Sequence, residues 1–302
     1  MTISNTFVEE TLKPKWEKHL NSPEKHIAYD PRKGIEKATF EKEGTKLVSL
    51  HNPRRLERFN LPGFGDNLLE EPSLIADFEE NGYVCLPNAK PILPHHCLWF
   101  KRDKGRNNSP QNGFTTEDLK NISDIVERTN IRCWINMIGG AASYDRYHAQ
   151  TILDKFPIEA YPVYMDKETG FGYIDYPAGN IVIRGTLEAR IKAIEKIIAK
   201  YRENFKSWNM TTIKKDNSCA DEAIFTLLCM KTDIIFIPRA QEVPETGISD
   251  AAGGLEMGGI FSLTSRAEFS KSNYQFLEMA LRSVSFPQSS IINKYFSIHP
   301  SI

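Results

Sequence analysis

Two periods of hydrophobic residues run along this chain, and each period predicts its own kind of element. Short apolar runs bounded by Gly, Pro or polar residues predict strands over residues 83–86, 96–100, 131–137, 162–165, 181–184 and 234–237. Apolar residues spaced three or four positions apart predict helices after Thr115 and over residues 186–205 and 274–284. Thr115 is a suitable N-cap because two acids, Glu117 and Asp118, follow it in the first turn.

The order of these elements predicts the fold class. Strands joined by short links and single helices, without regular strand–helix alternation, favour an α+β fold with a mainly antiparallel sheet and flanking helices. Residues 1–60 are charged and weakly periodic, so we expect a helical or irregular N-terminal wrap, followed by a loop over 59–69. A core is expected over 61–213, and the loop-like stretch 214–221 opens a C-terminal lobe, 214–302, packed on that core or continuous with it.

Composition and charge exclude several classes of protein. The formal net charge of -1 gives no general basic field for nucleic acid. The five cysteines include no C-x-x-C pair, which argues against a zinc ribbon and a redox dithiol. The N-terminus has no apolar leader, and no apolar stretch approaches the roughly 20 residues of a membrane helix. We therefore expect a cytoplasmic protein with neither a nucleic-acid nor a membrane partner.

One histidine pair invites a metal interpretation that the strand pattern argues against. His95, His96 and Cys97 are consecutive in a predicted strand. Adjacent strand residues point to opposite faces, so at most two of the three side chains converge. Packing within the strand, with one histidine at the surface, is the favoured interpretation, and no metal site is predicted.

A run of small residues follows the apolar strand 131–137 and suggests an anion site. Gly139 and Gly140 let backbone N–H groups approach an anion closely, and the hydroxyl of Ser143 can donate to a phosphate oxygen. A Gly-Gly-Ala-Ala run by itself is more often a plain turn. The strand before it, which ends near Asn136, and the polar residues after it favour a binding site here.

The nucleophile candidate lies just downstream. In an extended segment residues i and i+2 share a face, so Arg146, His148 and Gln150 would address one ligand. A neutral imidazole can attack phosphorus and form a phosphoramidate, while the Gln150 amide donates to the non-bridging oxygens. Arg146 adds a fixed positive charge. A His-x-Gln pair alone usually occurs by chance at a protein surface. The hypothesis therefore depends on its combination with the upstream strand and Asn136.

The segment Gly-Ala-x-Ser-x-x-x-x-His-x-Gln resembles the active-site segment of the transferase branch of the histidine-triad superfamily. That branch includes diadenosine tetraphosphate phosphorylases, GDP-galactose phosphorylases and galactose-1-phosphate uridylyltransferases. Their shared motif is His-x-His-x-Gln, whose second His is the nucleophile. His148 and Gln150 match that His and the Gln, and Ser143 and Asn136 match the upstream Ser and Asn. The resemblance implies a histidine-triad-like catalytic core over 61–213.

Two further stretches resemble the dinucleoside polyphosphate phosphorylases, so that the resemblance covers roughly residues 60–265. In the first, around residues 67–102, the resemblance implies that Asn88 and Lys90 lie near the nucleotide; a solvated turn lysine is the alternative for Lys90. In the second, around residues 223–259, Arg239 follows Pro238 at the end of a strand. Arg239 is either a phosphate or substrate ligand or part of a structural ion pair.

One position departs from the family motif. Arg146 stands where the family has its first His, which in the uridylyltransferases is also a zinc ligand alongside a cysteine pair. This chain lacks both features, so no such zinc site is expected. No cofactor motif is visible, and Mg²⁺ would enter only with the substrate phosphates. The Gln at 150, where the hydrolase branch carries His, favours nucleotidyl transfer over hydrolysis.

These observations lead to one main hypothesis. The chain is expected to be a nucleotidyltransferase that cleaves a nucleoside di- or polyphosphate derivative through a nucleotidyl-histidine on His148. Inorganic phosphate or a phosphorylated acceptor then takes the nucleotidyl group. The alternatives are a hydrolase that uses the same intermediate and a nucleotide-binding regulator without turnover, which the Arg146 departure keeps open. Because the related uridylyltransferases are dimers, a homodimer is a further expectation.

Overall fold

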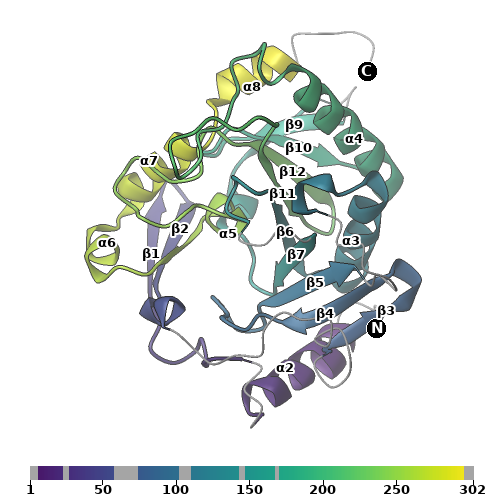
Figure 1. Cartoon of the computed structure of the whole chain (residues 1–302), viewed down its shortest axis with the longest axis vertical. Helices are drawn as coiled ribbons and strands as arrows, with labels where there is room; N and C mark the ends of the chain where they lie inside the picture. Colours follow the sequence, from purple (N-terminus) through teal and green to yellow (C-terminus); the bar gives the residue numbers. More distant parts are fainter. Residues whose placement is uncertain are drawn as a thin grey trace.

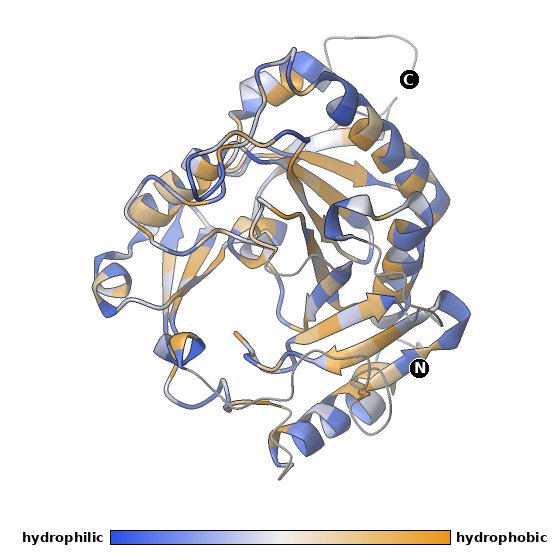
Figure 2. Ribbon diagram, viewed as in Figure 1, coloured by the Kyte–Doolittle hydropathy of each residue, from blue (hydrophilic) through white to orange (hydrophobic). Residues whose placement is uncertain are grey.

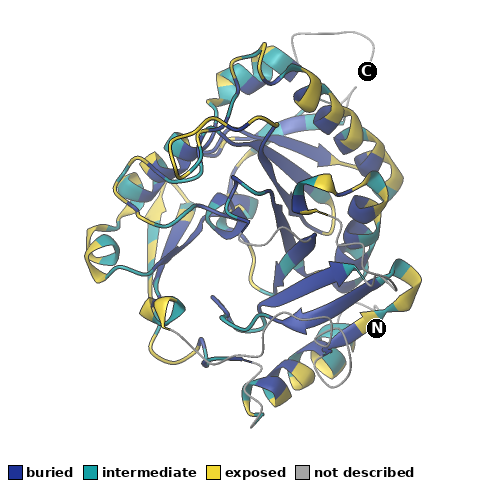
Figure 3. Ribbon diagram, in the orientation of Figure 1, coloured by how far each residue is buried: buried dark blue, intermediate teal, exposed yellow. Residues whose placement is uncertain are grey.

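The computed structural model describes residues 6–22, 27–57, 74–101, 110–142, 147–166 and 170–295. Within these ranges one large sheet runs through the molecule, with helices on one face and a small second sheet on the other (Figure 1). The strands of the large sheet are largely buried, and the outer helices expose one side each (Figure 3).

Ten of the described strands form the large sheet, and every neighbouring pair in it is antiparallel. In spatial order they are β3 (Ala76–Phe78), β4 (Tyr83–Pro87), β5 (Cys97–Lys101), β7 (His148–Ile152), β6 (Arg132–Asn136), β11 (Phe225–Cys229), β12 (Asp233–Pro238), β10 (Ile181–Arg184), β9 (Phe171–Ile174) and β8 (Val163–Met165). The predicted α+β class with a mainly antiparallel sheet is confirmed. Strands β11 and β12, from the expected C-terminal lobe, pair with β6 and β10 of the expected core.

One face of the large sheet is covered by helices. Helices α3 (Thr116–Thr129) and α4 (Leu187–Asn204) bury their apolar sides against β6, β11 and β12, and α8 (Gln288–Tyr295) adds Ile291 and Tyr295 to the same core. Both long helices are hydrophilic on the side facing away from the sheet (Figure 2). Thr115 accepts a hydrogen bond from the N–H of Asp118 and caps α3, as predicted.

The opposite face of the sheet is covered in part by a small three-stranded sheet. Its strands are β1 (Glu36–Lys42), β2 (Thr45–His51) and β13 (Ile260–Leu263), with β2 in the middle. The helices beside it are α5 (Gly254–Met257), α6 (Arg266–Lys271) and α7 (Tyr274–Val284). Its apolar residues form a second core with Trp134, Leu228 and Ile235 of the large sheet. Short 3₁₀ turns complete the fold: η2 (Pro53–Leu56), η4 (Glu79–Asn81), η5 (Gln111–Gly113) and η6 (Pro157–Ala160).

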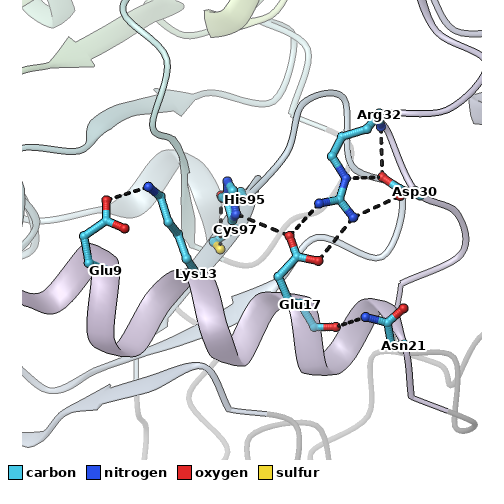
Figure 4. A network of polar contacts seen from close by, with 8 residues as sticks. All are labelled: Glu9, Lys13, Glu17, Asn21, Asp30, Arg32, His95 and Cys97. Carbon is cyan, nitrogen blue, oxygen red and sulfur yellow. Dashed lines mark hydrogen bonds and ion pairs between the residues drawn. The ribbon is translucent and has the colours of Figure 1, made fainter.

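The N-terminal helical segment packs against the loop before β5. It comprises a π-helical turn, η1 (Phe7–Leu12), followed by α2 (Lys13–Leu20). Figure 4 shows Glu17 of α2 between Arg32, whose guanidinium donates to it at 2.7 and 3.1 Å, and His95, whose Nε2 lies 3.8 Å away. Trp16 is fully buried and packs against the His95 ring, with 5.0 Å between ring centroids. This segment therefore supports the loop that precedes β5.

Most predicted elements are present, and one prediction was wrong. The strands at 83–86, 96–100, 131–137, 162–165, 181–184 and 234–237 correspond to β4, β5, β6, β8, β10 and β12, and the helices to α3, α4 and α7. The N-terminal residues were expected to be helical or irregular, but they also contain the β1–β2 hairpin. Six of the seven side chains of β1 are charged or otherwise polar or small, which hides the alternating pattern. The loop expected over 59–69 lies outside the described residues.

Candidate active site

A cavity of about 340 Å³ lies on the face of the large sheet opposite α3 and α4. It opens between the central strands, the loop that joins β4 to β5, the turn η2 and the segment that begins α5. Its lining residues are Arg55, Asn88, Ala89, Lys90, Ile92, His96, Trp134, Asn136, Ala141, Gln150, Ala251, Gly253, Gly254, Leu255 and Glu256. Four of the ten predicted site residues are among them.

Strand β7 points the candidate nucleophile and its glutamine to the cavity face. Tyr147 and Ala149 belong to the helix-covered core, so His148 and Gln150 lie on the other side of the strand. The register places Phe100 opposite His148, and Leu98 opposite Gln150. Gln150 lines the cavity, whereas His148 lies beside it and is 6% exposed. The predicted common face of His148 and Gln150 is therefore present.

Two neighbours hold His148. The Phe100 ring lies beside the imidazole, with 5.8 Å between ring centroids and 31° between ring planes. Gln111, which is fully buried, accepts from the His148 backbone N–H at 2.8 Å and donates to the His148 carbonyl at 3.2 Å. The same Gln111 amide donates to the carbonyl of Asn136 at 2.5 Å. Gln111 thus joins β6 to β7 beyond the point where their ladder ends.

Gln150 is held by a buried histidine. His96 Nε2 lies 3.0 Å from Gln150 Oε1, and the backbone N–H of Ile92 donates to His96 Nδ1 at 3.2 Å. Burial lowers the pKa of His96 to about 3, although the Gln150 bond opposes that shift. The imidazole is therefore neutral at physiological pH. The strand-packing interpretation of this histidine is incomplete, because His96 also lines the cavity.

The small-residue run after β6 forms a tight turn at the edge of the cavity. The N–H groups of Gly140 and Ala142 both donate to the carbonyl of Met137, at 2.9 and 3.1 Å. Gly139 has φ +85° and Ala141 has φ +72°, and Ala141 lines the cavity. The glycines themselves are not in the lining. Ser143 and Arg146, the next two predicted ligands, lie outside the described residues.

Asn136 ends β6 and faces the cavity. It is 4% exposed, and its side-chain Oδ1 is buried with no hydrogen-bond partner in the described part of the chain. Opposite it, the backbone of Gly253 approaches so closely that a Cβ there would lie 2.9 Å from Asn136 Nδ2. At Gly254 a Cβ would lie 2.4 Å from the Trp134 ring. The Gly-Gly pair lets α5 close one wall of the cavity against β6.

Two cations line the described part of the cavity. Lys90 donates through Nζ to the carbonyls of Arg55 and Glu57, at 3.3 and 2.9 Å, and so fixes the end of η2. Arg55 donates to the Ser262 hydroxyl at 3.1 Å. Asn88 accepts from the backbone N–H of Lys90 at 2.9 Å. Asn88 and Lys90 therefore line the cavity, and their position near a bound nucleotide stays a prediction.

A half-buried glutamate shares this end of the cavity. Glu256 accepts from the backbone N–H groups of Gly253 and Ser262, at 2.8 and 3.2 Å. Burial raises its pKa, and the positive charge of Arg55 opposes that rise. The group caps the first turn of α5, so it has a structural role as well as a position in the cavity wall.

Arg239 does not line the cavity. Its guanidinium is fully buried and donates to the carbonyls of Val284 and Gln241, at 3.1 and 3.0 Å, and to the Thr226 hydroxyl at 3.3 Å. The burial lowers its pKa to about 10. These bonds connect β11, β12 and the end of α7, so packing accounts for this residue. A role as a substrate ligand stays a prediction.

The described residues contain no group of three or more His, Cys, Asp or Glu side chains arranged to hold a metal ion. Mg²⁺ entering with substrate phosphates stays an expectation. Among the same residues, no helix is both long and apolar enough to cross a membrane.

Four residues of the site were missed by sequence analysis. Gln111 lies in a polar stretch that carries no motif, and Arg55 lies in the segment assigned to an irregular wrap. Glu256 stands between two glycine pairs, a pattern too general to identify a carboxylate at a site. His96 was noticed but assigned to packing. The glycine pairs on either side of Glu256 are the sequence signal that could have pointed to this wall, because glycine permits close approach of the backbone.

The described fold is built on an antiparallel sheet. Its strand β7 carries the His-x-Gln pair beside a polar cavity that two cations line. Among solved structures, the chain is similar to yeast Ap4A phosphorylase Apa2, with a TM-score of 0.64 and 12% identity over 91% of this chain and 94% of that chain. The same enzyme in complex with AMP gives a TM-score of 0.66 at 13% identity, covering 91% and 96%. Its complex with Ap4A gives 0.65 at 13%, covering 91% and 97%.

This likeness confirms, at the level of the fold, the resemblance to the diadenosine tetraphosphate phosphorylases. No protein-family model matches the sequence, and comparison with curated protein sequences finds no match.

Proposed function

We propose that this chain is a nucleotidyltransferase of the phosphorylase type. It cleaves a nucleoside di- or polyphosphate derivative between phosphates and passes the nucleotidyl group to inorganic phosphate or a phosphorylated acceptor. The observation that carries the proposal is the common face of His148 and Gln150 beside a cavity with two cations. Its occurrence on the fold of a known dinucleoside polyphosphate phosphorylase supports the same assignment.

In the proposed first step, a ring nitrogen of His148 attacks the α-phosphorus. A P–N bond forms while the P–O bond to the leaving phosphate breaks, and the electron pair departs with that phosphate oxygen. In the second step, an oxygen of the acceptor phosphate attacks the same phosphorus and the P–N bond breaks. His148 is then restored. The products are the free leaving group and either a nucleoside diphosphate, when inorganic phosphate is the acceptor, or a nucleoside diphosphate ester that keeps the acceptor's own substituent.

The other predicted ligands have proposed roles in charge stabilisation. Negative charge spreads over the non-bridging oxygens in the transition state, and preorganised donors stabilise it there. The Gln150 amide lines the cavity and lies two residues after His148 on the same face of β7. The Ser143 hydroxyl, the backbone at Gly139 and Gly140, and the Arg146 guanidinium are proposed as further donors.

Phosphate groups beyond the α-phosphate would meet the cationic end of the cavity. Arg55 presents a planar set of N–H donors, of which one bond goes to Ser262, and so retains donors for an anion. Asn88, Lys90 and Asn136 complete this wall. Mg²⁺, where present, would be bound by the substrate phosphates and would neutralise part of their charge.

Adenine nucleotides are the first substrates to examine, because yeast Ap4A phosphorylase was solved with AMP and with Ap4A. The purified chain would be incubated with Ap4A, other dinucleoside polyphosphates and nucleotide sugars, with and without inorganic phosphate. Nucleoside diphosphate formed only with phosphate supports the phosphorylase. Nucleoside monophosphate formed equally without phosphate would instead favour the hydrolase. Saturable binding without any product would favour the non-catalytic regulator.

A further inference from the structure

Gln150 can present either of two amide atoms to the cavity, and the choice decides its chemistry. An amide oxygen repels phosphate oxygens, whereas the amide NH₂ group donates to them. The two ends of the amide have the same shape, so only hydrogen bonding selects between them. A glutamine that is to stabilise a phosphoryl group therefore needs a partner that occupies its oxygen.

The backbone fixes which nitrogen of His96 carries hydrogen. The N–H of Ile92 points at His96 Nδ1 at 3.2 Å, and a backbone N–H can only donate. Nδ1 must therefore offer its lone pair, which leaves the hydrogen of the neutral ring on Nε2. Nε2 lies 3.0 Å from Gln150 Oε1, within hydrogen-bond range. His96 thus donates to the amide oxygen of Gln150.

The Asn88 contact with His96 taken alone would favour an acceptor at Nε2, and the Ile92 N–H at Nδ1 decides against that tautomer. Asn88 Oδ1 accepts from the backbone N–H of Lys90 at 2.9 Å, so the Asn88 amino group is the end that faces His96 Nε2, at 3.2 Å. Two donors that face one another form no hydrogen bond, and the Nε2 hydrogen is directed to Gln150 instead. His96 is 1% exposed, so water does not compete for that hydrogen.

We infer that His96 is a positioning residue that locks the Gln150 amide with its amino group toward the phosphoryl group bound at the cavity. This inference rests on the proposed function. The hydrogen bond from His96 to Gln150 persists over a wide pH range, because burial keeps the His96 ring neutral. The His148 imidazole then forms the covalent bond to phosphorus, and the His96 imidazole orients the Gln150 amide.

A double-mutant cycle tests this role. We would measure the single-turnover rate of nucleotidyl-enzyme formation in the full chain for the variants His96→Leu, His96→Gln, Gln150→Ala and His96→Leu/Gln150→Ala. His96→Leu is expected to lower the rate about 10²-fold, as loss of one oxyanion donor does, with little change in the nucleotide KM. His96→Gln should recover much of the rate, since its amide N–H reaches toward Gln150.

The decisive readout is non-additivity. If His96 acts through Gln150, the double variant is no slower than Gln150→Ala alone. Losses that multiply, or an unchanged rate in His96→Leu, would overturn the inference. His95→Asn is the matched control, because His95 is the neighbouring histidine, contacts Trp16 and Glu17 rather than Gln150, and has φ +61°, which Asn tolerates. It should keep the unmutated rate.

A second measurement needs no stable variant of the buried residue. In the unmutated chain labelled with ¹⁵N-histidine, His96 should show an unprotonated Nδ1 and a protonated Nε2 from about pH 5 to about pH 8. A ring protonated on Nδ1 would overturn the inference. If the unmutated chain forms no nucleotidyl-histidine, the proposed function fails, whereas additive losses among active variants refute only the role of His96.

Discussion

Gln111 binds both main-chain polar groups of His148: its Oε1 accepts from the N–H at 2.8 Å and its Nε2 donates to the carbonyl at 3.2 Å. At this point the β6–β7 ladder has ended, since its last pair is Trp134 with Gln150. Gln111 replaces the missing strand partner and fixes the backbone from which the candidate nucleophile projects. The position of His148 therefore depends on a side chain 37 residues earlier in the sequence.

Replacing Gln111 by Ala should therefore affect both stability and activity. Three main-chain groups, including the Asn136 carbonyl, would lose a buried partner. We expect the free energy of unfolding to fall by about 2–4 kcal/mol, because each unsatisfied buried group costs about 1–3 kcal/mol. The rate of nucleotidyl transfer should fall about 10-fold or more as His148 loses its geometry. Urea unfolding and single-turnover kinetics would measure the two effects.

Gln288→Ala is the matched control for this variant. Gln288 binds both main-chain groups of Asn180 in the same way, at 2.8 and 2.9 Å, but does not line the cavity. It should lose stability and keep its activity in the folded fraction. Equal loss of activity in both variants would mean that Gln111 matters only for folding.

Arg55 should contribute to the binding of phosphate groups. We expect Arg55→Gln to lower kcat/KM for the phosphate acceptor about 10- to 100-fold, since a hydrogen bond to a charged group contributes about 1.5–3 kcal/mol. Arg54→Gln is the control, because Arg54 lies over the Tyr29 ring at 4.9 Å and is not in the cavity lining. Phosphate titrations of both variants provide the comparison. An unchanged KM for phosphate in Arg55→Gln would remove Arg55 from the site.

Gly254 should tolerate no side chain. A Cβ there would lie 2.4–2.6 Å from three atoms of Trp134, so α5 would have to move away from the sheet. We expect Gly254→Ala to lower the free energy of unfolding by about 1–3 kcal/mol and to weaken nucleotide binding, since Gly253, Gly254 and Glu256 line the cavity. Calorimetric titration with nucleotide checks the binding.

Gly34→Ala serves as the comparison for Gly254→Ala. A Cβ at Gly34 would meet no atom within 4 Å, so only its positive φ of +74° adds strain. Nucleotide binding should be unchanged. Wild-type affinity in Gly254→Ala would refute the close-approach argument.

Asp118 should make stability depend on pH. Burial alone would raise its pKa, but hydrogen bonds from Thr115, Tyr83 and Lys101 outweigh burial and lower it below the ordinary 3.8. A lowered folded-state pKa adds stability above the unfolded-state pKa, and that stability is lost as the pH falls through the folded-state value.

Asp118→Asn is therefore expected to be less stable than the unmutated chain by about 1–2 kcal/mol at neutral pH, as for loss of a helix cap. The difference should shrink as the pH falls below the ordinary carboxyl pKa of 3.8. Urea unfolding at several pH values measures it. A difference that is constant across the range would show that the carboxylate charge is not responsible.

The sequence predicted the parts of this fold that depend on local patterns. The i, i+2 relation of His148 and Gln150 holds because strand geometry alone fixes it. The α3 cap at Thr115 and the bounds of α7 were predicted because capping residues and helical spacing are also local patterns.

The missed features depend on contacts between distant segments. Gln111 acts on His148 across 37 positions, and Arg55 reaches the cavity because β2 pairs with β13, more than 200 residues later. No local period encodes such pairings. His96 was visible in the sequence, but its role appears only when the register places Leu98 beside Gln150 and so brings the preceding loop to the cavity.

The most direct test of the central claim is to trap the intermediate. The chain would be incubated with α-³²P-labelled nucleotide substrates, quenched within one turnover, and analysed beside His148→Ala and His95→Asn. We predict label that stays on the unmutated protein and on His95→Asn, is acid-labile and base-stable, maps to His148, and is absent from His148→Ala. Phosphate-dependent turnover without protein-bound label, or equal labelling of His148→Ala, would contradict a nucleotidyl-histidine on His148.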